Sequence, residues 1–505
     1  MQSAAVGAAP YAEVHETHAG VVFLVGEHAY KLKKPEDFGF LDYSTRELRR
    51  AACHREVELN ERLAPDVYQG VLDVVGPDAV PVDHLVAMRR MPDERRLSTL
   101  VRDGADIDDE LRRIAHLLAA FHSRAERGPE IAREGTAAAL RDRWMSSLTQ
   151  IRPFQEQVLG GETPEIERLA MRFIDGRGEL FASRIADDRI VDGHGDLLAG
   201  DIFCLDDGPR VLDCLEFDNR LRWVDGLDDA AFLAMDLERL GAPQAAATFL
   251  RAYADFVGDP APAALHHHYI AYRAFVRAKV ACLRQAQGDG EAAAEARMLE
   301  RIALEHLHRG AVRLIIVGGS PATGKTTVAE ALADRLGMTL LSSDRVRKER
   351  AGLGHWQSAA AGYKEGIYTE EASRAVYGEL LRRAQELLSR GESVIVDASW
   401  SDALFRSHAE GLAATTLADF VELRCTAPEE VVAQRLAHRA TAGSVSDADA
   451  TIARSMAAAF HPWPKATPLD TSRPMRDVLT DALALAAPRP AVEPWHPHRP
   501  VMTAD

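Results

Sequence analysis

The sequence predicts an N-terminal α+β domain, residues 1–308, joined to a C-terminal α/β domain with a parallel sheet, residues 309–482. The N-terminal part opens with strand patterns bounded by glycine and continues as amphipathic helices. After residue 312, apolar strands alternate with helices, with later strands expected at 338–343, 393–399 and 418–426, as in βα units around a parallel sheet. The last stretch, residues 483–505, is rich in proline and is expected to form a loosely ordered tail.

The composition is that of a globular protein with an adequate core. The chain has 505 residues, of which 47% are hydrophobic and 27% charged, and both fractions are ordinary for a soluble protein. No apolar run approaches the ~20 residues that cross a bilayer, and the N-terminus lacks the basic start and apolar stretch of a signal peptide. We therefore expect a cytoplasmic protein without a membrane partner.

Charge and cysteine usage argue against several functions. The formal net charge of −17 disfavours broad binding of nucleic acid, because that needs a basic surface. The five cysteines are scattered without a CxxC pair or a Cys/His ligand spacing, so neither disulfides nor a zinc site is indicated.

Several segments of the N-terminal domain have clear periodicity. They are a β-hairpin at 16–34, a helix at 45–63, a strand at 86–92, a helix at 111–124 and a strand at 210–217. In the second helix, one face is apolar and is expected to be buried; it consists of Leu111, Ile114, Leu118 and Phe121.

Three aspartates have the spacing that metal-dependent phosphate chemistry requires. The segment HGDLLAGDIF, residues 194–203, places Asp196 after His-Gly and Asp201 five residues later. Asp213 follows in the apolar segment VLDCLEF, with Glu216 as an alternative ligand. Such a loop needs one carboxylate to receive the proton of an acceptor hydroxyl and two further groups to bind Mg²⁺. We expect Asp196 to be the base and Asp201 and Asp213 to bind the metal.

A basic side chain for the phosphates is expected on the hairpin. Lys31 and Lys33 share one face of the strand AYKLKK, because side chains alternate along a strand. Lys31, which lies deeper in the strand, is the favoured contact for the α- and β-phosphates of ATP. Glu56, on the following helix, is its expected ion-pair partner. Exposed lysines without a role are the alternative.

These segments resemble the aminoglycoside phosphotransferase family. The resemblance covers about residues 11–305 and is strongest at HGDLLAGDIF and VLDCLEF. It implies a two-lobed, protein-kinase-like fold with ATP and Mg²⁺ as cofactors, Asp196 as catalytic base, and Asp201 and Asp213 at the metal. The family pattern HGDxxxxN has asparagine where this chain has Asp201, which adds a negative charge near the triphosphate.

Two groups of charged residues follow this loop. Asp225, Asp228 and Asp229 are expected to cap the next helix or to anchor the loop rather than to catalyse. Arg273 and Arg277 lie one turn apart in the helical segment YIAYRAFVRAKVACLR. We expect both arginines to be solvated, and contact with a phosphate or with the acidic cleft of the N-terminal domain is the alternative.

The C-terminal domain begins with a phosphate-binding loop. An apolar strand runs into GGSPATGKTT, residues 318–327, and an amphipathic helix follows. The loop fits the pattern G-x-x-x-x-G-K-[ST], whose backbone N–H groups curl around phosphate at a helix N-terminus. Lys325 is expected to reach the β- and γ-phosphates, and the Thr326 hydroxyl to bind Mg²⁺. The expected nucleotide contacts are Gly319, Ser320, Pro321, Ala322, Thr323, Gly324, Lys325, Thr326 and Thr327.

Charged residues follow later strands of this domain. Asp344 lies just past the expected strand at 338–343 and can accept a proton from an acceptor hydroxyl, while Arg347 can hold a phosphate or the acceptor. Asp397 ends the expected strand at 393–399 and is a candidate to hold the magnesium shell. Helix capping is the alternative for both aspartates.

Two arginines are candidates for a lid over the nucleotide. Arg435 and Arg439 are four residues apart in the helical segment APEEVVAQRLAHRA. At that spacing they share one face of a helix, from which they can clamp the transferring phosphoryl group. A solvated helix face is the alternative.

The region of about residues 312–480 resembles the small-molecule P-loop kinases and the related AAA_33-type ATP-binding domains. That grouping includes gluconate-kinase-like proteins and the kinase part of polynucleotide kinases. The resemblance lies in GGSPATGKTT, SSDRVR, VIVDAS and RLAHR. It implies ATP binding and phosphoryl transfer, and it leaves the acceptor open.

The pair of phosphate-handling units predicts a bifunctional ATP-dependent kinase that acts on small-molecule hydroxyl acceptors, with separate bases at Asp196 and Asp344. One alternative is a regulatory nucleotide-binding protein whose N-terminal domain catalyses weakly, which Asp201 in place of asparagine motivates. A weaker alternative is a nucleic-acid 5′-hydroxyl kinase, against which the net charge of −17 argues. Neither the acceptors nor the number of subunits is encoded in these motifs.

Overall fold

The computed structural model describes residues 12–16, 20–37, 42–353, 369–442 and 450–486. The chain divides into two compact units, of which the first comprises 1–143, 182–260 and 272–302 and the second comprises 144–181, 261–271 and 303–505. Four helices contribute residues to both units, namely α5 (Ala137–Ile151), α7 (Gly178–Ala186), α11 (Ala263–Ala286) and α12 (Ala292–Arg309). The domain limits at residues 308 and 482 stay a prediction.

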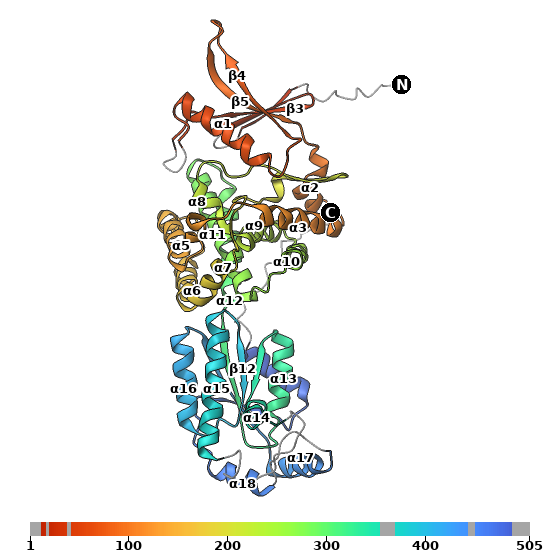
Figure 1. Ribbon diagram of the computed structural model, residues 1–505, viewed down its shortest axis with the longest axis vertical. Coiled ribbons are helices and arrows are strands. Elements are labelled where there is room, and N and C mark those ends of the chain that lie inside the picture. The colour runs from red at the N-terminus through yellow and green to blue at the C-terminus, as the bar shows by residue number, and fades with distance from the viewer. Residues whose placement is uncertain (1–11, 17–19, 38–41, 354–368, 443–449, 487–505) are drawn as a thin grey trace, which may run out of the picture. The chain divides into compact units, whose positions relative to one another are not determined.

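The first unit begins with a five-stranded antiparallel sheet in the order β1-β2-β3-β5-β4 (Figure 1). The strands are β1 Ala12–Glu16, β2 Gly20–Val25, β3 His28–Lys33, β4 Tyr68–Val75 and β5 Pro81–Arg89. Strands β2 and β3 form the predicted hairpin, in which Val22 lies opposite Lys31. Helix α1, Arg46–Asn60, packs against the sheet, and Thr45 caps it by accepting a hydrogen bond from the Leu48 amide.

The rest of the first unit is mainly helical. Its helices are α2 Leu97–Arg102, α3 Asp108–Arg124, α4 Pro129–Arg133, α8 Asn219–Arg222, α9 Gly226–Arg239 and α10 Pro243–Val257, with 3-10 turns at Asp93–Arg95 and Ala199–Asp201. The predicted apolar face of α3 is buried. Together with the sheet, these helices form the α+β architecture that the sequence predicts, an antiparallel sheet followed by a mainly helical region.

Two antiparallel strand pairs hold the loop that contains Asp196. Strand β6, Ile190–Asp192, precedes the loop and pairs with β9, Trp223–Asp225. Strand β7, Ile202–Leu205, follows the loop and pairs with β8, Gly208–Val211. The predicted strand at 210–217 is therefore wrong beyond Val211, and Asp213 lies in the loop after β8.

The second unit contains a parallel five-stranded sheet in the order β11-β12-β10-β13-β14. The strands are β10 Arg313–Gly318, β11 Thr339–Ser342, β12 Val394–Asp397, β13 Asp419–Thr426 and β14 Thr467–Asp470. Four of them are predicted from the apolar runs in the sequence, whereas β14 is not. Because all strands are parallel, their carboxyl ends meet at one edge, where ligands of such sheets bind.

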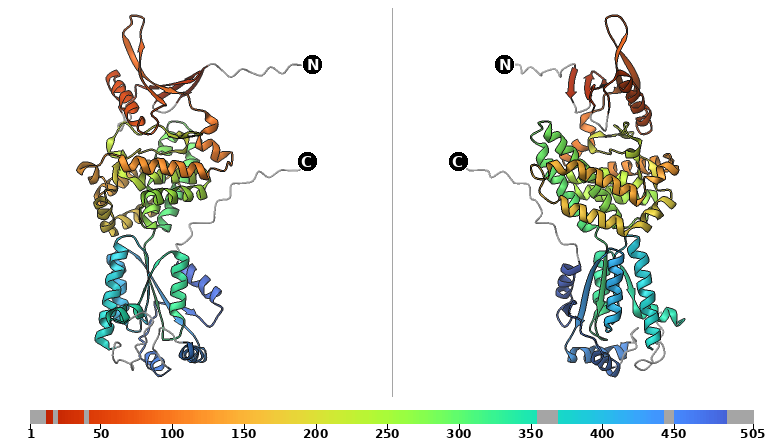
Figure 2. Two further views of the ribbon diagram at one scale, coloured as in Figure 1. Left: turned by 45° about the vertical axis from the view of Figure 1, so that its right-hand side comes forward. Right: turned by 90° about the vertical axis from the view of Figure 1, so that its left-hand side faces the viewer.

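Helices cover both faces of this sheet (Figures 1 and 2). They are α13 Lys325–Leu336 and α19 Met475–Ala486, and α15 Glu370–Ser389 and α16 Ala403–Thr415. The further helices of this part of the chain are α14 Ser343–Arg350, α17 Glu429–Ala442 and α18 Ala450–Ala458. Helices α13 and α19 share a buried core with the strands, which includes Val317, Val328 and Ala482. The second unit also includes α6, Thr163–Gly176, and a 3-10 turn at Arg152–Phe154. Within the described residues, no helix is both long and apolar enough to span a bilayer.

Candidate functional sites

The phosphate-binding loop in the second unit joins the end of β10 to the start of α13. Its backbone takes the left-handed conformation at Gly319 (φ 142°), Ala322 (φ 63°) and Gly324 (φ 85°). A side chain at Gly319 is impossible without a shift, because a Cβ atom there would lie 2.5 Å from the carbonyl oxygen of Cys425. These turns lead the chain into the helix that begins at Lys325, as a phosphate loop requires.

A threonine–aspartate pair lies beside this loop, where the sequence predicts the metal. The Thr326 hydroxyl donates a 2.8 Å hydrogen bond to Oδ2 of Asp397 at the end of β12. Asp397 is buried, and its Oδ1 atom has no hydrogen-bond partner. Burial raises the pKa of Asp397. The nearby Lys325 charge and the hydrogen bond from Thr326 act in the opposite direction. An orphaned carboxylate oxygen next to a hydroxyl fits Mg²⁺, which prefers such ligands.

The other predicted residues of this unit lie in α14 and α17. Asp344 is in the first turn of α14, and its charge contributes to raising the pKa of Asp397. Arg347 lies one turn later, with Nη1 3.4 Å from the Ser373 hydroxyl. The side chain of Arg439 lies outside the described residues.

Arg435, the first of the two predicted lid arginines, holds the phosphate loop to the end of β14. Its Nη1 donates to the carbonyl oxygen of Ala322 at 3.3 Å, and its Nη2 donates to the carbonyl oxygen of Thr471 at 2.7 Å. The Thr471 hydroxyl in turn donates to the Thr323 carbonyl oxygen at 2.7 Å. Arg435 is thus next to the loop, and its donors bind the carbonyl oxygens of Ala322 and Thr471 and the Thr471 hydroxyl.

In the first unit, Glu56 binds both lysines of β3. Its Oε1 lies 3.0 Å from Nζ of Lys31, and its Oε2 lies 2.7 Å from Nζ of Lys33. Glu56 is fully buried; burial alone would raise its pKa, but the two lysine charges lower it to about 2. The predicted ion pair of Lys31 with Glu56 is present in the structure, and Lys33 is a second partner that the prediction did not include.

The loop after β8 supplies one acid to each lysine. Asp213 lies 2.5 Å from Lys31, and Glu216 lies 2.5 Å from Lys33. The Tyr43 hydroxyl donates to Glu216 as well. Asp213 has a left-handed backbone, with φ of 64°, a conformation that costs free energy in a residue with a side chain and recurs at functional sites.

Asp196 and Asp201 belong with Asp213 to one acidic group, because the charge of Asp213 acts on both of them. Burial raises the pKa of Asp196 to about 6, and Arg277 acts in the opposite direction. Burial, Asp213 and Asp196 raise the pKa of Asp201. Such negative charge is what a divalent cation would neutralise, and carboxylates suit Mg²⁺. In the described parts of the chain, however, no three potential ligands are close enough together to hold a metal ion, so these metal roles stay a prediction.

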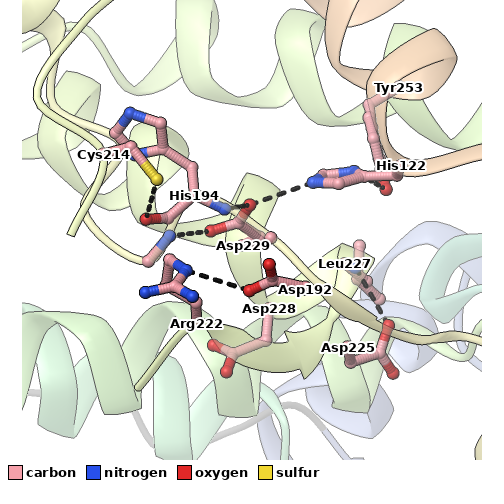
Figure 3. A network of polar contacts seen from close by, with 12 residues as sticks. His122, Asp192, His194, Cys214, Arg222, Asp225, Leu227, Asp228, Asp229 and Tyr253 are labelled. Carbon is pink, nitrogen blue, oxygen red and sulfur yellow. Dashed lines mark hydrogen bonds and ion pairs between the residues drawn. The ribbon is translucent and has the colours of Figure 1, made fainter. Parts of the chain in front are cut away.

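Asp229 anchors the loop that carries Asp196 (Figure 3). Its carboxylate accepts hydrogen bonds from the amides of His194 at 2.7 Å and Gly195 at 2.8 Å, and from Nε2 of His122 at 2.9 Å. Burial alone would raise the pKa of Asp229, but these contacts hold it well below its ordinary value. The prediction that Asp229 anchors the loop is confirmed.

The neighbouring aspartates have structural roles too. Asp225 caps α9 by accepting a hydrogen bond from the Leu227 amide, as the sequence predicts. Asp236, two turns after Asp229, accepts from the Ala199 amide at 2.8 Å. The sequence analysis missed Asp236, although its seven-residue spacing from Asp229 places both on one helix face. Tyr43 was also missed, because nothing in its surrounding sequence marks it.

Comparisons with known proteins identify one family model and relatives that span most of the chain. Residues 314–463 match the family model AAA_33, described as an AAA domain. The uncharacterized proteins Mb2027c of Mycobacterium bovis and Rv2004c of Mycobacterium tuberculosis are each 44% identical to this chain over 466 residues, which is 92% of this chain and 93% of the relative. The chain belongs to the same family as these mycobacterial proteins.

Two solved structures are similar to separate parts of the chain. A choline/ethanolamine kinase family protein from Mesorhizobium loti matches with 14% identity and a TM-score of 0.36, over 60% of this chain and 94% of that chain. A gluconokinase from Sinorhizobium meliloti 1021 matches with 19% identity and a TM-score of 0.26, over 35% of this chain and 92% of that chain.

The structure and the AAA_33 match together define the coarse class. The C-terminal part has a phosphate-binding loop on a parallel sheet and matches the AAA_33 model, and the N-terminal part has an antiparallel sheet followed by a mainly helical region.

Proposed function

We propose that this protein is a bifunctional ATP-dependent phosphotransferase with two nucleotide sites, each acting on a hydroxyl group of a small molecule. One observation supports this most directly. Each unit has, from its own residues, a cation that can bind phosphate and acidic groups that can bind metal and accept a proton. In the first unit these are Lys31 with Asp196, Asp201 and Asp213. In the second unit they are Lys325 with Asp397 and Asp344. Neither set borrows a residue from the other unit.

In the N-terminal site, Asp196 takes the proton of the acceptor hydroxyl. The acceptor oxygen forms a bond to the γ-phosphorus of ATP, the bond to the β,γ-bridging oxygen breaks, and ADP leaves. Lys31, oriented by Glu56, binds the α- and β-phosphates. Asp201 and Asp213 would hold Mg²⁺, which when bound neutralises charge on the phosphates.

In the C-terminal site, the same transfer is carried out with different groups. Backbone amides of the loop and Lys325 bind the phosphates, and Asp344 accepts the proton of the acceptor. Arg347 and Arg435 contact the transferring group or the acceptor. Thr326 and Asp397 would hold Mg²⁺ at the phosphates. The acceptor of each site is a small molecule, with no nucleic acid or membrane as partner.

The test is to inactivate each site by itself. Asp196→Ala and Lys325→Ala are assayed for ATP turnover and for transfer of labelled phosphate to the small metabolites of a cell extract. Each variant is expected to lose a different set of labelled products and to keep the other, while Asp206→Ala, at an exposed position, keeps both. If either change alone abolishes all transfer equally, two independent sites are ruled out.

A second function, regulation by nucleotide binding, has one observation in its favour. Asp201 stands where the related pattern has asparagine, and its pKa is raised by burial and by the neighbouring carboxylates of Asp213 and Asp196. The test uses the Lys325→Ala variant. If this protein binds Mg²⁺–ATP but transfers no phosphate to any metabolite, the result favours the regulatory function. The third alternative, a nucleic-acid 5′-hydroxyl kinase, is tested with a 5′-hydroxyl oligonucleotide as acceptor. Labelling of that oligonucleotide would support it.

A further inference from the structure

One arginine of α11 faces the candidate base of the N-terminal site. Nη1 of Arg277 lies 4.0 Å from Oδ1 of Asp196. That distance is too long for a hydrogen bond, so the guanidinium donors are not occupied by this carboxylate. The side chain of Arg277 is 20% exposed, and its buried Nε has no hydrogen-bond partner. Arg277 therefore reaches the site with donors available for a ligand.

The other cations near this site are already paired. Arg273, one turn earlier on α11, is buried and donates two hydrogen bonds to Asp228, at 2.7 and 2.8 Å. Lys31 lies between Glu56 and Asp213. The loop between Asp196 and Asp201 reads LLAG and contains no basic residue.

Phosphoryl transfer needs positive charge close to the moving group. The charge of the transition state is spread over three equatorial phosphoryl oxygens, and preorganised cations stabilise it. The acceptor oxygen must lie about 3 Å from the Asp196 carboxylate to give up its proton. The phosphorus that this oxygen attacks is then a near neighbour of Asp196, so its equatorial oxygens come within reach of a guanidinium 4.0 Å from the same carboxylate.

We propose that Arg277 binds the γ-phosphoryl group of ATP in the N-terminal site and stabilises it during transfer. The inference rests on the proposed function of that site. Arg277 donates hydrogen bonds to phosphoryl oxygens as the oxygen–phosphorus bond to the acceptor forms and the bond to ADP breaks. The proton of the acceptor goes to Asp196, not to Arg277.

The test compares ATP with ADP, which lacks the γ-phosphoryl group. Full-length protein with Lys325→Ala, which removes the phosphate-loop lysine, is titrated calorimetrically with each nucleotide and Mg²⁺, alone and combined with Arg277→Gln. We expect Arg277→Gln to weaken binding of ATP about tenfold or more while binding of ADP changes less than about twofold, because a hydrogen bond to a charged group is lost. Arg277→Lys, which keeps the charge, is expected to fall between.

Arg284→Gln is the matched control on the same helix. Arg284 pairs with Asp289 and Glu295. The Arg284→Gln substitution is therefore expected to leave the affinities for ATP and ADP unchanged. Unchanged ADP binding also demonstrates that the Arg277 variants are folded.

Two outcomes separate the inference from the function on which it depends. If the Lys325→Ala protein binds no nucleotide, the proposed N-terminal site is wrong. If it binds both nucleotides and Arg277→Gln leaves the ratio of the two affinities unchanged, the role of Arg277 alone is wrong. That second result is also the one expected if Arg277 contacts an anionic group of the acceptor instead.

Discussion

Replacing Asp229 with asparagine is expected to loosen the loop that carries Asp196. The buried carboxylate accepts hydrogen bonds from two loop amides, at 2.7 and 2.8 Å, and from His122 at 2.9 Å. Hydrogen bonds to a charged acceptor contribute about 1.5–3 kcal/mol each. Asparagine keeps one acceptor oxygen but turns an NH₂ group toward at least one donor, so at least one bond is lost and the others weaken. We expect loop opening to become easier by about 3 kcal/mol, or about 100-fold.

Hydrogen exchange measures this opening directly. Exchange is followed by mass spectrometry in peptides that cover residues 190–201, where the amides of His194 and Gly195 lie. Asp206→Asn is the control, because that side chain is 98% exposed and pairs with Arg95 at the surface; its change in stability is expected to stay within about 0.5 kcal/mol. Exchange in the Asp229→Asn protein that remains within about threefold of the parent would refute the anchoring role.

Further predictions concern the charged groups of both sites. Glu56→Gln removes the shared partner of two lysines and is expected to destabilise the first unit by about 3–5 kcal/mol, measured by thermal unfolding. Because the pKa of Glu56 is lowered to about 2, the stability that it contributes is present above pH 4.5 and is lost between pH 4.5 and 2. A variant as stable as the parent would contradict the burial argument. Asp397→Asn is expected to raise the Mg²⁺ concentration required for ATP turnover at the C-terminal site about 10–100-fold. The measurement is made in the Asp196→Ala background. An unchanged Mg²⁺ requirement would argue against a metal at Thr326. Transfer at the N-terminal site, measured as kcat/KM in the Lys325→Ala background, is expected to fall as pH drops through about 6, where Asp196 becomes protonated; a profile that is flat from pH 7 to 5 would exclude Asp196 as the base.

The phosphate loop could be predicted from the sequence because its chemistry is local. A strand, a glycine-rich turn and a helix are consecutive in the chain, so the ten residues from 318 to 327 determine their own geometry. Glycine at positions 319 and 324 predicts a left-handed backbone there, and the structure has it at both. Strand β14 could not be predicted in the same way, because its four residues include a proline and are mostly exposed, so they carry no apolar pattern.

The N-terminal site was less predictable because its parts are distant in sequence. The pairing of Lys33 with Glu216 joins residues 183 positions apart, and periodicity carries no information about such a contact. The same holds for Arg277 and Asp196, whose proximity depends on the packing of α11. The expected strand at 210–217 failed for a local reason: Asp213 takes a left-handed backbone conformation, which ends extended structure even though Leu212, Cys214 and Leu215 continue the apolar pattern.

The charges around the N-terminal site bear on whether Asp201 indicates lost activity. Burial and the charges of Asp213 and Asp196 raise the pKa of Asp201, while Lys31 and Arg96 act in the opposite direction. At Asp196, Arg277 and Arg273 likewise oppose the effect of burial on the pKa. The additional acid therefore lies among cations that already act on this acidic group. That setting favours a site that binds metal and triphosphate over one that has merely lost a ligand, and therefore favours catalysis over the regulatory alternative.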